Sequence, residues 1–161
     1  MQGLHLTADL HGCPADRALM SDAHALRRLC LAAVDAAGLQ PVGELFHRFA
    51  AMGSVPVGIT GSDVSPPVGI TGKDVSTLVG ITGRDVSTPV GITGVVLLAE
   101  SHLAVHTWPE MASVTLDVYV CNLGTDNTAR AHALMAALVA AFEPTQVERH
   151  VLQRGKPGAA A

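Results

Sequence analysis

Hydrophobic and polar residues alternate strictly in two parts of the chain. In the first part, polar side chains separate Leu4, Leu6, Ala8 and Leu10. In the second part, they separate Val114, Leu116, Val118 and Val120. A period of two places successive side chains on opposite faces of a strand, so each part predicts a strand with one buried and one open face.

Two other stretches repeat their hydrophobic residues with the spacing of a helix. The first stretch ends at Gly38 and the second ends before Pro144, and both residues are typical helix stops. The candidate N-caps are Ser21 or Asp22 for the first helix and Thr125 or Asn127 for the second. The hydrophobic stripes consist of Leu26, Leu29, Cys30, Ala33 and Ala37, and of Ala131, Leu134, Met135, Leu138 and Phe142.

Three further segments complete the predicted elements. Residues 95–99 form a continuous apolar run, which is typical of a strand buried on both faces. Residues 42–49 and 146–152 are weaker strand candidates. The order of these elements predicts an α+β fold, a two-layer α/β sandwich in which two helices cover an antiparallel sheet. The length of 161 residues suits a single domain over residues 1–161.

The middle of the chain is a tandem repeat. The five residues Val-Gly-Ile-Thr-Gly recur with a strict period of 11, starting at Val57, Val68, Val79 and Val90. Repeats can stack into a small solenoid or a binding array, but this period matches none of the common repeat architectures. We therefore predict that residues 54–90 are an insertion loop, which a domain tolerates at a small entropic cost. Residues 154–161 are predicted to be a disordered tail.

Composition narrows the class of protein. Charged residues make up 15% of the chain and the net charge is −4, so no nucleic-acid partner is expected. No apolar run is long enough to cross a membrane, and the first residues lack the pattern of a signal peptide. The three cysteines are widely spaced and odd in number, which suits neither a disulfide framework nor a zinc site. We expect a cytoplasmic location.

The densest group of polar residues, 100–110, follows the most apolar strand candidate. Three interpretations are open from the residues alone. Two histidines four residues apart, with a flanking glutamate, suit a metal ion. Ser101 with a histidine and Asp117 suits a hydrolase triad. The third interpretation is a structural hydrogen-bond network at a sheet edge.

The same stretch resembles a known family. Residues 100–110 read Glu-Ser-His-Leu-Ala-Val-His-Thr-Trp-Pro-Glu, which is similar to the prokaryotic S-adenosylmethionine decarboxylase proenzymes. The resemblance includes the chain start at 4–13, residues 46–49, a strand that ends in Cys121, and the second predicted helix. Only the repeat and the tail lie outside it.

The resemblance implies a proenzyme that cleaves itself between Glu100 and Ser101. In this family the serine attacks the preceding carbonyl, and the downstream fragment then begins with a pyruvoyl group, here derived from Ser101. That group forms a Schiff base with the substrate amine and draws electrons from the carboxylate bond, so no metal is required. The implied reaction converts S-adenosylmethionine to decarboxylated S-adenosylmethionine, the aminopropyl donor of spermidine biosynthesis.

The resemblance also assigns residues to roles. His106 takes the place of the histidine that serves as processing base, and Thr93 that of the residue whose hydroxyl assists it. Cys121 takes the place of the residue that protonates the product carbon, and a thiol is a suitable proton donor near neutral pH. The family is expected to form a homodimer of cleaved protomers.

The implied substrate contacts are Phe49, stacked on adenine, and Glu110, which accepts hydrogen bonds from the ribose. Trp108 lines the same region, and Leu103 is a weaker candidate. A carboxylate would also bind a guanidinium or an ammonium group, so the same chemistry on arginine or ornithine is an alternative. The repeat lies between Phe49 and Thr93, so a second alternative is a binding or regulatory paralogue that does not process itself.

Overall fold

The computed structural model describes residues 2–49 and 90–155. The strands are β1 (Gly3–His11), β2 (Pro41–Arg48), β3 (Ile92–Leu98), β4 (Ser101–Trp108), β5 (Ser113–Cys121) and β6 (Gln146–Arg154). The helices are α1 (Ala18–Ser21), α2 (Ala23–Ala36), α3 (Thr128–Phe142) and the short 3₁₀ helix η2 (Pro109–Met111).

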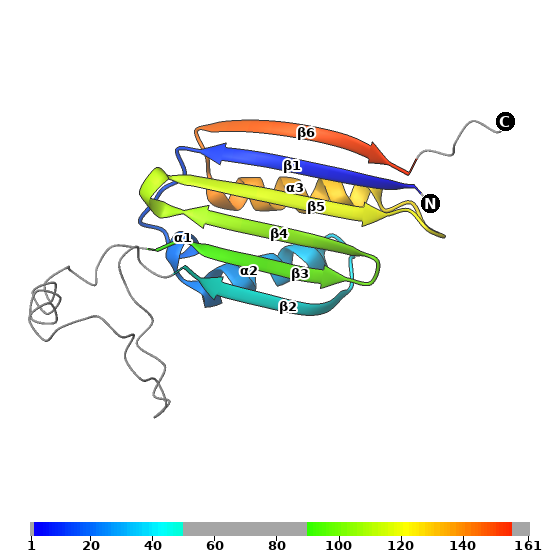
Figure 1. Ribbon diagram of the computed structural model, residues 1–161, viewed down its shortest axis with the longest axis horizontal. Helices are drawn as coiled ribbons and strands as arrows, with labels where there is room; N and C mark the ends of the chain where they lie inside the picture. Colours follow the sequence, from blue (N-terminus) through cyan, green and yellow to red (C-terminus); the bar gives the residue numbers. More distant parts are fainter. Residues whose placement is uncertain (1, 50–89, 156–161) are drawn as a thin grey trace, which may run out of the picture. The chain divides into compact units, whose positions relative to one another are not determined.

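The strands form one sheet in the order β2-β3-β4-β5-β1-β6, and all neighbours are antiparallel. Figure 1 shows the helices on one face of this sheet, with α2 against β2 and β3 and α3 against β5 and β1. Within the described ranges, no helix lies on the opposite face, which we call the open face. The predicted two-layer α+β sandwich is therefore confirmed.

The alternation in the sequence decides which side chains face the helices. Along β1, the leucines at 4, 6 and 10 are at most 3% exposed, while the polar residues between them are half-buried on the open face. Strand β5 has the same pattern, with its valines buried and Thr115, Asp117 and Tyr119 on the open face. Because residues paired across antiparallel strands share a face, the register carries this division across the sheet.

Both predicted helices are present. Asp22 caps α2, since its Oδ1 accepts hydrogen bonds from the backbone N–H groups of His24 (2.8 Å) and Ala25 (3.3 Å). These bonds lower the pKa of Asp22 below its usual range. Helix α3 starts after Asn127 and ends before Pro144. The single turn α1 has no hydrophobic period of its own, and no pattern in the sequence predicts it.

The segment that follows β3 differs from its expected form. Residues 101–108, which stand out in the sequence only as a polar group, form the strand β4 in the middle of the sheet. Leu103 and Val105 face the helices, while His102, Ala104 and His106 lie on the open face. The polar group is therefore one side of a strand that is buried on its other side.

Two boundary predictions fall partly or wholly outside the described residues. The predicted insertion, 54–90, lies outside them except for Val90. The tail predicted from residue 154 starts too early, because Arg154 is the last residue of β6 and pairs with Gly3. Residues 156–161 lie outside the described part of the chain. No helix of the described residues is long and apolar enough to cross a membrane.

The start of β3 requires glycine at two positions because neighbouring strands approach it closely. A Cβ atom at Gly91 would overlap the backbone carbonyl oxygen of Thr107, and one at Gly94 would overlap the ring of Phe46. Backbone atoms cannot move aside as the end of a side chain can. Both glycines belong to the last copy of the repeated pentapeptide.

We expect the substitution Gly91→Ala to lower the free energy of unfolding by about 1–3 kcal/mol, because it overpacks a site walled by backbone. Chemical denaturation measures this change. The matched control is Gly43→Ala on β2, where a Cβ would meet its nearest atom, in Leu97, at an ordinary 3.5 Å. Equal stability of the two variants would contradict the close approach of β3 to β4.

Candidate active site

Ser101 is the first residue of β4 and follows a tight turn at residues 99 and 100. Its Oγ accepts a hydrogen bond from the backbone N–H of Cys121 at 3.0 Å. Glu100 is exposed in the turn, whereas Cys121, the last residue of β5, is only 5% exposed. We call Glu100, Ser101 and Cys121 the serine cluster.

The other two cysteines, Cys13 and Cys30, are buried in the hydrophobic core and do not belong to the serine cluster. Burial raises the pKa of the Cys13 thiol and raises that of Cys30 to about 12. Cys121 is therefore the cysteine whose position suits a role at Ser101.

A second group of predicted site residues gathers near the opposite end of β4. Thr93 Oγ1 lies 3.2 Å from His106 Nδ1, and the two residues are paired across β3 and β4. The ring of His106 stacks on Trp108 at 5.9 Å between centroids. The ring centroid of Phe49 lies 6.4 Å from that of Trp108. We call Phe49, Thr93, His106, Trp108 and Glu110 the histidine cluster.

Glu110 belongs to this cluster by its place in the chain. It lies in η2, directly after Trp108 and Pro109, and is exposed. The backbone N–H of Phe49 donates to the carbonyl of Gly91 at 2.8 Å. The two ends of the segment that contains the repeat are thus in contact, and Phe49 lies in one cluster with Thr93.

Thr107 holds the histidine cluster together from the helix side. Its side chain is fully buried, and its Oγ1 accepts from the N–H of Ile92 (2.9 Å) and donates to the carbonyl of Met20 (2.8 Å). These bonds fasten the start of β3 to β4 at the residues next to Thr93 and His106. The sequence does not single out Thr107, because its role depends on the hydrogen bond to Met20 in α1, which lies 87 positions away in the chain.

The structure does not bring the two clusters together within one chain. A strand rises about 3.3 Å per residue, so the backbones of Ser101 and His106 are separated by about 16 Å along β4. This is far beyond the reach of a hydrogen bond between a base and the hydroxyl that it would activate. The family resemblance implies the members of the site but not this separation.

One predicted substrate contact does not lie on the open face. Leu103 is 0% exposed and belongs to the hydrophobic core under the helices. Its neighbours on β4, His102 and Ala104, point to the other side. The expectation that Leu103 contacts the substrate is not supported by this placement, because the side chain is closed off by the core.

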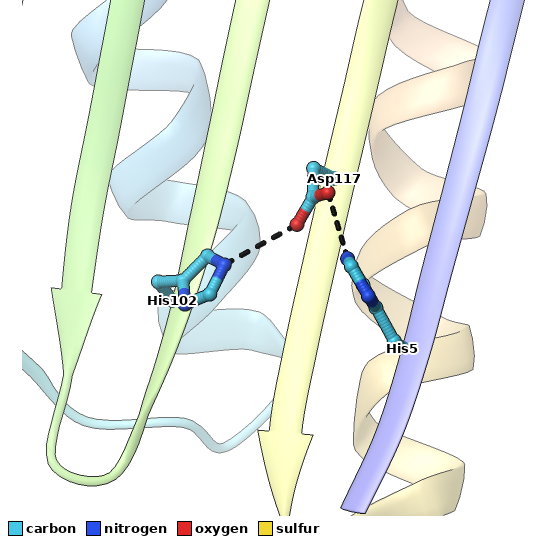
Figure 2. Close-up of polar contacts among 3 residues, drawn as sticks. All are labelled: His5, His102 and Asp117. Atoms are coloured by element: carbon cyan, nitrogen blue, oxygen red, sulfur yellow. Dashed lines mark hydrogen bonds and ion pairs between the residues drawn. The ribbon is translucent and has the colours of Figure 1, made fainter. Parts of the chain in front are cut away.

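A third cluster on the open face is only partly apparent from the sequence, where the triad interpretation groups Asp117 with a histidine of residues 100–110 but does not include His5. His5 Nε2 lies 2.7 Å from Asp117 Oδ2, and His102 Nε2 lies 3.3 Å from Asp117 Oδ1 (Figure 2). The sequence contains a further signal for it, since His5 and Asp117 lie on the polar sides of the two alternating strands. The pairing of β1 with β5 is needed to bring them together.

The open face is hollowed between these groups. A shallow cavity of about 410 Å³ is lined by residues of β1, β4 and β5, among them His102, His106 and Asp117. A second cavity, of about 300 Å³, lies between α3 and β6 and contains none of the predicted site residues. Among residues 2–49 and 90–155, no group of three or more His, Cys, Asp or Glu is arranged to hold a metal ion.

Comparison with known proteins identifies the family. The sequence matches the family described as S-adenosylmethionine decarboxylase over residues 4–65 and 75–155. It is 29% identical to the S-adenosylmethionine decarboxylase proenzyme of Aquifex aeolicus over 153 residues, which cover 95% of this chain and 81% of that protein. The proenzyme of Archaeoglobus fulgidus is 26% identical, with 95% of this chain and 97% of that protein covered.

A solved structure is similar as well. The crystal structure of the adenosylmethionine decarboxylase from Aquifex aeolicus superimposes with a TM-score of 0.67 and 26% identity. The match covers 99% of this chain and 96% of that one. Sequence and fold thus agree over nearly the whole length, and the chain belongs to the S-adenosylmethionine decarboxylase family.

Proposed function

We propose that the chain is the proenzyme of a pyruvoyl-dependent decarboxylase that acts in the cytoplasm. It converts S-adenosylmethionine to the decarboxylated aminopropyl donor used in spermidine biosynthesis. Its family membership and the names of its relatives support this reaction. The observation that carries the self-cleavage is the position of Ser101, directly after an exposed two-residue turn and hydrogen-bonded to the neighbouring strand.

The position of Ser101 fits the formation of a pyruvoyl group. In the proposed cleavage, Ser101 Oγ attacks the carbonyl carbon of Glu100, so an ester bond forms and the peptide bond breaks. Removal of the α-proton of residue 101 then breaks its Cβ–O bond and releases the Glu100 carboxylate. Addition of water and loss of ammonia leave a ketone at residue 101. Because the break lies in a turn, β3 and β4 keep their pairing on either side of it.

The pyruvoyl group supplies the electron sink for loss of the carboxylate. The remaining chemistry belongs to side chains of the chain itself. Cys121 donates the proton to the carbon that has lost carbon dioxide, since in the uncut chain its backbone N–H lies 3.0 Å from Ser101 Oγ and so places Cys121 beside residue 101. Phe49 and Trp108 offer aromatic faces for adenine, and Glu110 offers acceptors for the ribose hydroxyls.

We further propose that the active site is completed in a homodimer. The serine cluster and the histidine cluster each hold part of the predicted site, about 16 Å apart along β4. In a two-fold dimer through the open faces, the serine cluster of one protomer can meet the histidine cluster of its partner. His106 then acts, with Thr93, as processing base on the partner's serine cluster.

Mass spectrometry of the denatured protein tests the proposed function. Cleavage at the proposed bond yields fragments of 100 and 61 residues, the second beginning with the converted Ser101. Borohydride reduction in the presence of S-adenosylmethionine, arginine or ornithine then identifies the substrate by the mass of its adduct. We expect an adduct with S-adenosylmethionine. An intact chain under all conditions would instead favour the binding or regulatory paralogue.

Co-expression of Ser101→Ala with His106→Ala tests the shared site. We expect each variant alone to be inactive, because each lacks one half of every site. Half of the randomly assembled dimers are mixed and have one intact site out of two, so activity returns to about one quarter of the wild-type level. The measurement is decarboxylase activity per mole of protomer. Continued inactivity of folded, mixed dimers would place both clusters in the same protomer's site.

A further inference from the structure

The proposed self-cleavage, on which this inference rests, creates two new chain ends beside the reactive group. Cleavage turns the middle of the β3–β4 hairpin into two chain ends, and chain ends are poorly ordered unless something fastens them. The new end at residue 101 must nevertheless stay in register, because it carries the reactive carbonyl.

Residue 101 is paired with Leu98 on β3, but the hydrogen bond that connects it to β5 in the uncut chain does not survive the reaction. Its acceptor is Ser101 Oγ, bonded to the N–H of Cys121. In the proposed cleavage this oxygen leaves with Glu100 when the Cβ–O bond breaks. Residue 102 is then the first position of the new chain whose side chain is still connected to β5.

His102 makes two contacts with β5 on the open face. Its Nε2 lies 3.3 Å from Asp117 Oδ1, and its ring lies 5.6 Å from the ring of Tyr119 at an angle of 34°. Tyr119 is directly opposite His102 in the register, and Asp117 is two residues away along β5. The side chain of His102 therefore bridges two positions on the neighbouring strand.

Asp117 is itself held from the other side. Its Oδ2 accepts a hydrogen bond from His5 Nε2 on β1 at 2.7 Å, and the side chain of His5 is 22% exposed. Figure 2 shows the carboxylate between the two imidazoles, with β1 and β4 on opposite sides of β5. The three residues thus connect the start of β4 to two further strands.

The second carboxylate oxygen lacks a directed partner. Asp117 Oδ1 is shielded from solvent and accepts no hydrogen bond from the described residues, although His102 lies within ion-pair distance. An unpaired buried oxygen is unfavourable, and His102 Nε2, at 3.3 Å, is a donor nitrogen within ion-pair distance of it. The unpaired oxygen of Asp117 therefore faces the side chain next to the new chain end.

We propose that Asp117 is a positioning residue that anchors the start of the cleaved chain through His102, while His5 orients the carboxylate. Asp117 does not touch the reacting atoms in this assignment. It acts through His102 on the backbone of residue 101. The anchor matters little while the turn is intact and becomes essential once the turn is cut.

Hydrogen exchange before and after cleavage tests this assignment. In the cleaved protein, we expect Asp117→Asn to lose at least tenfold protection at the amides of residues 102–104. In the uncleavable Ser101→Ala background, the same substitution should change that protection less than twofold, because the turn still holds the strand. Loss of protection in both backgrounds would show a general structural role and overturn the proposal.

Turnover supplies the second readout, measured only on protein that mass spectrometry shows to be fully cleaved. We expect Asp117→Asn to lower kcat about 10- to 100-fold with a smaller change in KM, because the carbonyl is misplaced rather than the binding surface removed. His102→Gln, which keeps a donor, should retain more activity than His102→Leu. Equal loss in these two variants would contradict an anchor through Asp117.

A matched control is His150→Gln, a histidine on the same sheet that pairs only with the exposed Glu148 at 3.5 Å among the described residues. It should leave exchange and turnover unchanged. The failure of the proposed function is separately visible, since a wild-type chain that never cleaves would fail before any variant is compared.

Discussion

Alanine in place of Ser101 leaves one uncut chain of 161 residues with no decarboxylase activity. The substitution removes the only oxygen that can form the proposed ester with Glu100, so neither the break nor the ketone can arise. Because Ser101 is half-buried at a strand end and Oγ makes a single hydrogen bond within the described residues, the fold should persist. Mass spectrometry and circular dichroism measure the two outcomes.

The control is Ser113→Ala, which removes a hydroxyl from the first residue of β5. That hydroxyl is bonded to the carbonyl of Met111 at 2.9 Å and plays no part in the proposed site. We expect this variant to cleave as the wild type does. Cleavage of the Ser101→Ala chain into the same two fragments would exclude Ser101 as the source of the reactive group.

Alanine in place of Cys121 has the second large effect, and it separates cleavage from turnover. We expect the variant to cleave normally, because its backbone N–H still donates to Ser101. Turnover should fall by roughly 10²- to 10⁴-fold, the usual contribution of a positioned proton donor. The measurement is the release of carbon dioxide by fully cleaved protein.

Cys13→Ala serves as the matched control, since Cys13 is a buried thiol of the core. The substitution removes a thiol from the core and leaves the surroundings of Ser101 unchanged. We expect turnover near the wild-type level. Normal turnover by the Cys121→Ala protein would remove the assignment of this thiol as proton donor. If the Cys121→Ala protein does not cleave, Cys121 is required for self-cleavage rather than for turnover.

The reliability of sequence reasoning differs between elements for a physical reason. The alternation predicts β1 and β5 because a half-buried strand repeats every two residues, and Asp22 and Gly38 mark the ends of α2. β4 is harder to identify as a strand. Its open face carries His102 and His106, and these polar residues mask the alternation of the buried Leu103 and Val105 on the other face.

Leu103 illustrates the same limit within the candidate site. The family resemblance makes it a weaker candidate for a substrate contact. In a strand, however, neighbouring residues point to opposite faces, and Leu103 enters the core. Residues that are adjacent in the sequence are therefore the least certain to share one site when they belong to a strand.

Most of the local structure of this protein follows from the sequence alone, as do the types of side chain available for chemistry. Both are encoded in contiguous residues, through hydrophobic period, capping residues and the stretch 100–110. Which of these side chains meet is a property of the folded sheet. The fold places His5 against Asp117, 112 positions away, and it separates Ser101 from His106 on one strand. The pairing of distant strands depends on packing of the whole sheet, which no local pattern specifies.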